Sequence, residues 1–138
     1  MAGQDHLLAK GFLCTGAAAY VYGQAVVPVT GTALDPNQII QATAVVTANV
    51  IGLCQENMDL VKVQTGKAYV SVALVGIAFG IADGAVAIGA KVVPSVTTAG
   101  QLHGTAATGN TQVGIAMSSA TNAGDIFSVL LTPGVLIH

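Results

Sequence analysis

The sequence predicts an all-β fold, a single-domain β-sandwich or barrel built from two tandem, sequence-related halves. Turn-forming residues recur roughly every 8–12 positions, which is typical of such folds. The apolar runs between them are rich in Val and show no sustained helical period, so they favour strands over helices. One series of short motifs also occurs twice in the same order, which indicates an internal duplication.

The duplication is carried by short matches. We predict two copies at about residues 23–63 and 89–129, in which equivalent residues share a place in the fold. The isolated glycines lie inside strand patterns, which predicts a bulge or a close backbone approach. The matches are Gly-x-x-Val-Val-Pro at 23–28 and 89–94, Thr-Ala at 43–44 and 105–106, Gly52 with Gly114, and Asp59 with Asp125.

The strands follow from the apolar runs and the turns between them. Pro28 and Pro94 lack a backbone N–H, so each should lie on a sheet edge or at a strand end. The Thr65-Gly66-Lys67 stretch predicts a tight hairpin. We expect strands over residues 24–30, 39–46, 49–55, 60–65, 68–74, 86–88, 91–96, 113–116, 126–131 and 135–137.

The first part of the chain lies outside both copies. Residues 1–20 show no period, so we predict an N-terminal arm, followed by a β domain at residues 21–138. Residues 1 to about 12 of the arm are predicted to dock on a partner, and the alternative is a frayed terminus. The arm combines apolar anchors with charges. Its candidate binding residues are Asp5, Leu7, Leu8, Lys10 and Phe12.

The composition bounds the possible partners. Of the 138 residues, 53% are hydrophobic and only 7% are charged, so the surface is poorly protected against association. We expect sister subunits or a larger assembly to cover it. Four Lys and no Arg at a net charge of −2 exclude a phosphate-binding surface, and with it nucleic acid. The charge-free run at residues 68–82 is too short for a spanning helix, and the N-terminus does not resemble a signal peptide, so we expect a soluble protein made in the cytoplasm.

The residues that usually carry chemistry are scattered. His6, His103 and His138 have no metal-ligand spacing, and His103 stands at the position of Gln41 in the first copy. We expect no enzyme activity, no cofactor and no metal. Asp59 and Asp125 precede strands in turn sequence, so we interpret them, with Gly52 and Gly114, as structural turn residues. Cys14 and Cys54 do not make a disulfide framework, and Cys54 should be a small buried thiol.

The second half resembles the capsid decoration, or cement, proteins of tailed bacteriophages. The resemblance covers about residues 70–138, and residues 20–65 through the duplication. The motifs that carry it are the Gly-Ile-Ala-x-Gly-Ile-Ala-Asp-Gly-Ala-Val run that starts at Gly76, Thr105-Ala106, Thr108-Gly109-Asn110, Val113-Gly114-Ile115-Ala116, Ala123-Gly124-Asp125 and Leu130.

The resemblance implies a structural virion protein that binds the outer surface of a phage capsid and stabilises the shell. Its partner would be the major capsid protein, and members are often trimers. Avidity would then make the attachment tight, because several subunits each contribute modest contacts. The alternative is a β-sandwich adhesion or glycan-binding module displayed on a virion or cell surface, although glycan sites usually expose more aromatic residues than this chain contains.

Overall fold

A computed structural model describes residues 8–29, 37–42, 50–105 and 111–136. The predicted all-β class is confirmed. Over these residues no helix is long and apolar enough to cross a membrane. The elements are β1 (Leu8–Cys14), β2 (Ala25–Pro28), β3 (Gln38–Gln41), β4 (Gly52–Cys54), α1 (Leu60–Val63), β5 (Tyr69–Val75), β6 (Ile77–Ile81), β7 (Lys91–Pro94), β8 (Leu102–Thr105), β9 (Thr111–Ala116) and β10 (Ile126–Leu136).

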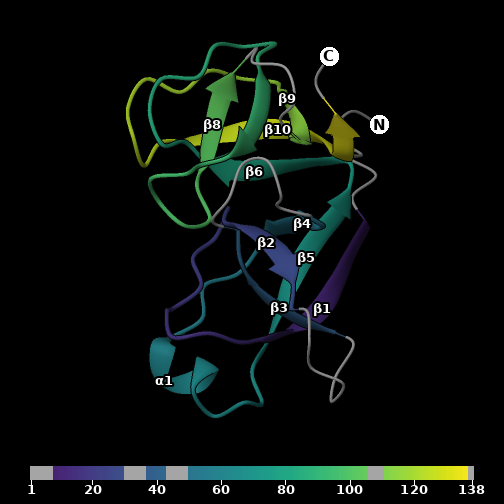
Figure 1. Cartoon of the computed structure of the whole chain (residues 1–138), viewed down its shortest axis with the longest axis vertical. Coiled ribbons are helices and arrows are strands. Elements are labelled where there is room, and N and C mark those ends of the chain that lie inside the picture. Colours follow the sequence, from purple (N-terminus) through teal and green to yellow (C-terminus); the bar gives the residue numbers. More distant parts are fainter. Residues whose placement is uncertain (1–7, 30–36, 43–49, 106–110, 137–138) are drawn as a thin grey trace, which may run out of the picture.

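The strands form two sheets that repeat one order. The first is a closed barrel, β1-β3-β2-β4-β5, and the second is β6-β10-β9-β7-β8. Because the first sheet is closed, its order can also be read from β3, as β3-β2-β4-β5-β1. The second order, read from β8, is β8-β7-β9-β10-β6. Strands β1–β5 therefore correspond one for one to β6–β10. In the second sheet, a parallel bridge pairs Ala82 with Leu102. It corresponds to the parallel pair of Cys14 and Ile39 in the first sheet. Figure 1 shows the sheets as two stacked lobes.

The register confirms the predicted equivalence of the two glycines. Gly52 lies opposite Val26 in the first sheet, and Gly114 lies opposite Val92 in the second. Both glycines are strand residues and not turn residues. The bridge between Tyr20 and Met58 likewise recurs between Val86 and Ala120. The repeating unit includes β1 and β6, so it is longer than the predicted copies at 23–63 and 89–129.

Asp59 and Asp125 are not equivalent, and this part of the prediction is wrong. Asp125 precedes β10, whereas Asp59 precedes α1. The strand that corresponds to β10 is β5, because Tyr69 and Ile126 pair with equivalent residues. Ten residues separate Met58 from Tyr69, but only five separate Ala120 from Ile126. The first copy therefore carries an insertion, and α1 lies within it.

The predicted strand at residues 60–65 is also wrong. Val63 N donates to Asp59 O and Gln64 N donates to Leu60 O, which are the bonds of one α-helical turn. Val63 is buried and Val61 is exposed. A single turn is too short to show a helical period, and its Val residues favoured the strand prediction.

Residues 8–20 belong to the folded body and not to an arm. β1 pairs antiparallel with β5 and parallel with β3, so it closes the first barrel. Its exposed Leu8, Lys10 and Gly11 obscure this in the sequence, since only Leu13 and Cys14 are buried.

The register of His103 differs from expectation too. It lies opposite Val93 as Ile40 lies opposite Val27, so its counterpart is Ile40 and not Gln41.

Two clusters of buried side chains fill the lobes. The first barrel encloses Tyr20, Ile39, Val70 and Val72, among others. The second cluster is built around Phe127, Val129, Leu102 and Val113, and it also includes residues of the first barrel: Ala25, Ala42, Val50, Leu53 and Ala73. The halves are therefore one packed body. Pro28 and Pro94 are the last residues of β2 and β7, as predicted.

Candidate docking surfaces

The predicted binding residues lie on β1 where the structure describes them. Asp5 and Leu7 lie outside the described residues. Leu8 and Lys10 are exposed and Phe12 is half-buried. Lys10 Nζ lies 5.3 Å from the centroid of the Phe12 ring and donates to Asn37 Oδ1 at 3.1 Å. β1 thus presents an apolar side chain beside a cation held in place by two neighbours.

Three of the four residues predicted to be structural, Asp125, Gly52 and Gly114, lie in close contact with the backbone. The Asp125 carboxylate accepts hydrogen bonds from the backbone N–H groups of Thr121 and Asn122, at 3.0 and 2.9 Å, and so closes the turn before β10. Asp59 occupies the N-cap position of α1 without a side-chain capping bond. At Gly52, an added Cβ would collide with the Ala73 carbonyl oxygen. At Gly114, an added Cβ would collide with the Leu130 carbonyl oxygen.

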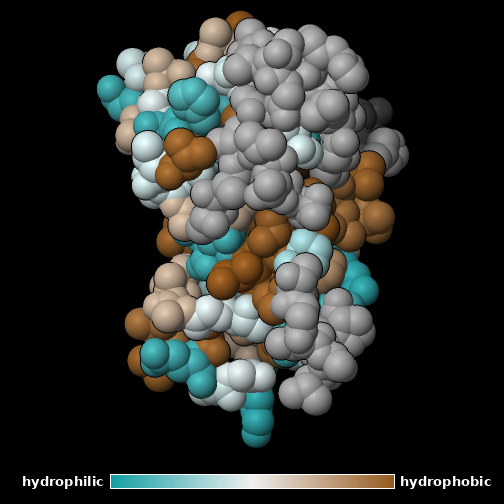
Figure 2. All heavy atoms as spheres, in the orientation of Figure 1, coloured by the Kyte–Doolittle hydropathy of each residue, from teal (hydrophilic) through white to brown (hydrophobic). Residues whose placement is uncertain are grey.

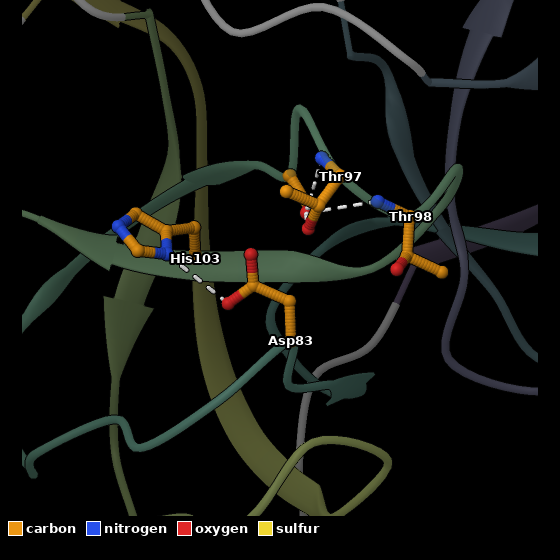
Figure 3. A network of polar contacts seen from close by, with 5 residues as sticks. Asp83, Thr97, Thr98 and His103 are labelled. Carbon is orange, nitrogen blue, oxygen red and sulfur yellow. Dashed lines mark hydrogen bonds and ion pairs between the residues drawn. The ribbon is translucent and has the colours of Figure 1, made fainter.

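Figure 3 shows two sets of polar contacts on the second lobe, one that includes Asp83 and His103 and one that includes Thr97 and Thr98. His103 Nδ1 lies 3.1 Å from Asp83 Oδ1. The Ser95 hydroxyl is fully buried and accepts bonds from the backbone N–H groups of Thr97 and Thr98. Ser95 is therefore committed to its own turn, and the recorded contacts form two separate networks instead of a catalytic triad. Over the described residues no group of three or more His, Cys, Asp or Glu could hold a metal ion.

The buried titratable groups lie inside the first barrel. Cys14 and Cys54 are unpaired and buried, as predicted for Cys54. Burial raises the pKa of the Cys14 thiol to about 11, and it also raises the pKa of Cys54. The Tyr20 hydroxyl donates within the core to the Ile39 or Thr15 carbonyl oxygen, each at 2.8 Å. Burial raises the pKa of Tyr20 to about 12. These three residues are part of the buried cluster of the first barrel.

The second sheet carries an apolar outer face that the sequence analysis missed. Ile77, Phe79, Met117 and Ile126 are between 37% and 49% exposed, and Ile115 and Leu130 are half-buried beside them. The signal was present in β10, where apolar residues occupy both alternating faces. From the sequence alone, without knowledge of how β10 pairs with its neighbours, this pattern is typical of a strand buried on both faces. Apolar side chains also reach the surface near the junction of the lobes in Figure 2.

Comparison with known proteins finds a likeness to a solved structure. No family model and no curated protein matches the chain. Among solved structures, the chain is similar to the head fiber gp8.5 N base of bacteriophage phi29, with a TM-score of 0.64 at 14% sequence identity. The match covers 96% of this chain and 99% of that chain. The two proteins therefore share a fold along almost their whole lengths.

Proposed function

We propose that this chain is a structural protein of a bacteriophage virion that binds the outer surface of the capsid and stabilises the shell. The observation that carries the proposal is the fold shared with a phage head fiber base over 96% of the chain. The resemblance of the second half to capsid decoration proteins points to the same class of protein, and it extends the proposal to the major capsid protein as the partner.

The surface supports a role in assembly. Only 7% of the residues are charged, and the exposed large apolar side chains include Leu8, Val75, Ile88 and Val96. An isolated protein with such a surface is prone to association, whereas a virion component has it covered. The proposal is for a non-enzymatic protein that acts through burial of apolar surface and strand pairing.

The proposed mechanism is avidity. The resemblance to capsid decoration proteins implies a trimer, in which each subunit would add modest apolar contacts. Simultaneous attachment of the subunits would be far tighter than any one contact. β1 is one candidate contributor, through Leu8 and the cation of Lys10 beside Phe12.

Co-sedimentation with capsids assembled in the absence of this protein tests the proposal. The protein should pellet with the capsids and saturate at a fixed ratio to the major capsid protein. Decorated capsids should also release DNA at a higher temperature than bare capsids. Protein that stays in the supernatant at every concentration would sink the capsid-binding proposal.

A further inference from the structure

The insertion in the first copy projects from the end of the first lobe. Residues 59–68 connect Met58 to Tyr69, whereas residues 121–125 make the equivalent connection in the second copy. In Figure 1, α1 lies at the end of the first lobe that is farthest from the second sheet. We call residues 59–68 the α1 projection. Because the second copy closes the same connection with a shorter segment, the topology does not require a connection of this length.

One side of the α1 projection is fixed to the first barrel. Val63 is 3% exposed and belongs to the buried cluster of that barrel. At the end of the helical turn, the Thr65 hydroxyl donates to Lys62 O at 2.6 Å. Cys14 N, on β1, donates to Ala68 O at 2.8 Å. The α1 projection therefore has a defined conformation before a partner arrives, so binding costs it little ordering entropy.

The other side of the α1 projection combines apolar and cationic side chains. Val61 is 76% exposed, the highest value among the exposed large apolar side chains of the described residues. Leu60 beside it is 37% exposed, and Lys62 and Lys67 are exposed as well. Figure 2 shows hydrophobic and hydrophilic atoms side by side at the lower left, where α1 lies in Figure 1. The α1 projection thus presents an apolar tip and two lysines to solvent.

The net charge of the α1 projection is opposite in sign to that of the rest of the chain. Lys62, Lys67 and Asp59 give it a net charge of +1, so the remaining residues together carry −3, for a total of −2. Neither lysine forms an ion pair within the part of the chain that the structure describes. The neighbouring carboxylate of Glu56 accepts a hydrogen bond from Ser71 N at 2.6 Å. The two ammonium groups are therefore available to carboxylates of another molecule.

The equivalent connection of the second copy has neither feature. Residues 121–125 read Thr-Asn-Ala-Gly-Asp, without a lysine or a large apolar residue. Its Asp125 carboxylate turns back onto the N–H groups of Thr121 and Asn122. One position in the duplicated fold thus carries a plain turn in one copy and an apolar, cationic projection in the other. Packing within the described chain accounts for the buried Val63 but not for the exposed side chains of the projection.

We propose that the α1 projection docks into an apolar depression bordered by carboxylates on the outer surface of the capsid. Val61 and Leu60 enter the depression, and Lys62 and Lys67 pair with carboxylates at its rim. The apolar contact supplies the affinity, and the lysines orient the subunit and speed the encounter. The inference rests on the proposed function and deepens it, because it names the element that binds and the chemistry of the surface that receives it.

The size and position of the α1 projection fit a protein surface. A segment that binds a lipid surface needs an extended amphipathic face, and a single helical turn with two exposed apolar side chains buries too little for that. The projection also lies near one end of the longest axis of the molecule (Figure 1). A subunit attached through it therefore stands upright on the shell, with its second lobe pointing outward.

Substitutions in matched pairs test the tip and the charge separately. Val61→Ser removes the apolar contact, whereas Val61→Leu retains it. Lys62→Glu reverses the charge, whereas Lys62→Arg retains it. Lys91→Glu is the control for a charge reversal elsewhere, because Lys91 is exposed on β7 in the second lobe. Thermal melting checks that each variant folds as the wild type does.

Co-sedimentation with capsids that lack this protein gives the dissociation constant of each variant. Val61→Ser should bind roughly tenfold or more weakly than the wild type, and Lys62→Glu roughly three- to tenfold more weakly. Val61→Leu, Lys62→Arg and Lys91→Glu should bind within about threefold of the wild type. Salt raised from about 0.05 to about 0.5 M should weaken the wild type more than Lys62→Glu, since the lysine contribution is screened.

The other outcomes separate this inference from the proposed function. Val61→Ser and Lys62→Glu variants that fold and bind as tightly as the wild type would overturn the inference and leave the proposed function standing. A wild-type protein that never pellets would overturn both. Light scattering of the free protein gives a further check. If Val61→Ser lowers the mass of a wild-type oligomer, the projection binds a second copy and the capsid contact proposed here is wrong.

Acetylation of lysines covers the case in which a variant does not fold. On the wild-type protein, capsid binding should slow the acetylation of Lys62 and Lys67 by roughly tenfold or more, because the contact covers them. Acetylation of Lys91 should stay nearly unchanged, and mass spectrometry of the digested protein reads out all three sites. Lys62 and Lys67 that react as fast on the capsid as in solution would contradict the inference.

Discussion

At the scale of single residues, the two equivalent glycines lie where the neighbouring strand leaves no room for a Cβ. Each lies at the same register position, and a side chain there would meet a carbonyl oxygen of the neighbouring strand, Ala73 in one sheet and Leu130 in the other. The sequence predicted a bulge or a close approach, and the structure shows the close approach. Because the obstacle is backbone, it cannot rotate away as a side chain could.

Gly114→Ala should therefore destabilise the protein. We expect a loss of about 1–3 kcal/mol or more in the free energy of unfolding, measured by urea denaturation. Gly84→Ala is the matched control, because a Cβ at Gly84 meets nothing within 4 Å, and it should stay within about 0.5 kcal/mol of the wild type. Equal stability of the two variants would show that the strands can separate at no cost.

Burial of Tyr20 and Cys14 predicts sensitivity to alkali. Their folded-state pKa values, about 12 and about 11, lie above the ordinary values of 10.0 and 9.0. A raised pKa stabilises the fold fully below the ordinary value, and this stabilisation is lost as the pH rises towards the folded value. The melting temperature should therefore fall above pH 9.

Tyr20→Phe separates the tyrosine from the thiols. It removes the titrating hydroxyl and its bonds to Thr15 O and Ile39 O, so the variant should be less stable than the wild type at pH 7, by about 1–3 kcal/mol. Its further loss between pH 10 and 11 should be smaller. A fall as steep as that of the wild type would assign the alkaline transition to other groups.

At the scale of elements, β1 shows how an exposed strand can be mistaken for a tail. Most of its side chains face solvent, so its sequence lacks the alternation of a half-buried strand. Its backbone nevertheless bridges β3 and β5, and without it the first barrel has two open edges. For α1 the error was the opposite one, because a helical turn was predicted to be a strand. Its Val residues favoured the strand, whereas the structure has a single helical turn there.

Deleting residues 1–11 should therefore weaken the fold itself. The deletion removes the partners of Val75, Ala73, Val72 and Ser71 on β5 and opens the barrel. We expect the melting temperature to fall by roughly 10 °C or more, or folding to be lost, as followed by circular dichroism. Lys10→Ala, which alters only an exposed side chain, serves as the control. An unchanged melting temperature in the deletion variant would restore the interpretation of this segment as an arm.

At the scale of the whole molecule, the barrel and the second sheet share one core. Leu53 and Ala73 belong to the first sheet but pack with Phe127 and Val129 of the second. Because Leu53 and Ala73 are members of this cluster, the second sheet lacks part of its core without the first. The duplication therefore produced two units of one fold that depend on each other.

Leu53→Ala should expose this dependence. Removing the fully buried side chain leaves a cavity between the barrels, and we expect a loss of about 2–5 kcal/mol in the free energy of unfolding. The effect should appear in both halves, so a single transition should move as a unit in thermal melts followed by two probes. A variant in which only the first barrel melts early would contradict a shared core.

The sequence by itself determined the all-β class, the duplication, and the equivalence of Gly52 with Gly114. These depend on composition, turn residues and order along the chain, which are local properties. It did not reveal the length of the repeating unit, the role of β1, the helical turn of α1 or the non-equivalence of Asp59 and Asp125. Each of those depends on which strand pairs with which. Tertiary structure alone also decided that Leu53 is fully buried while its counterpart Ile115 is half-buried, because burial is set by what the rest of the chain places against a face.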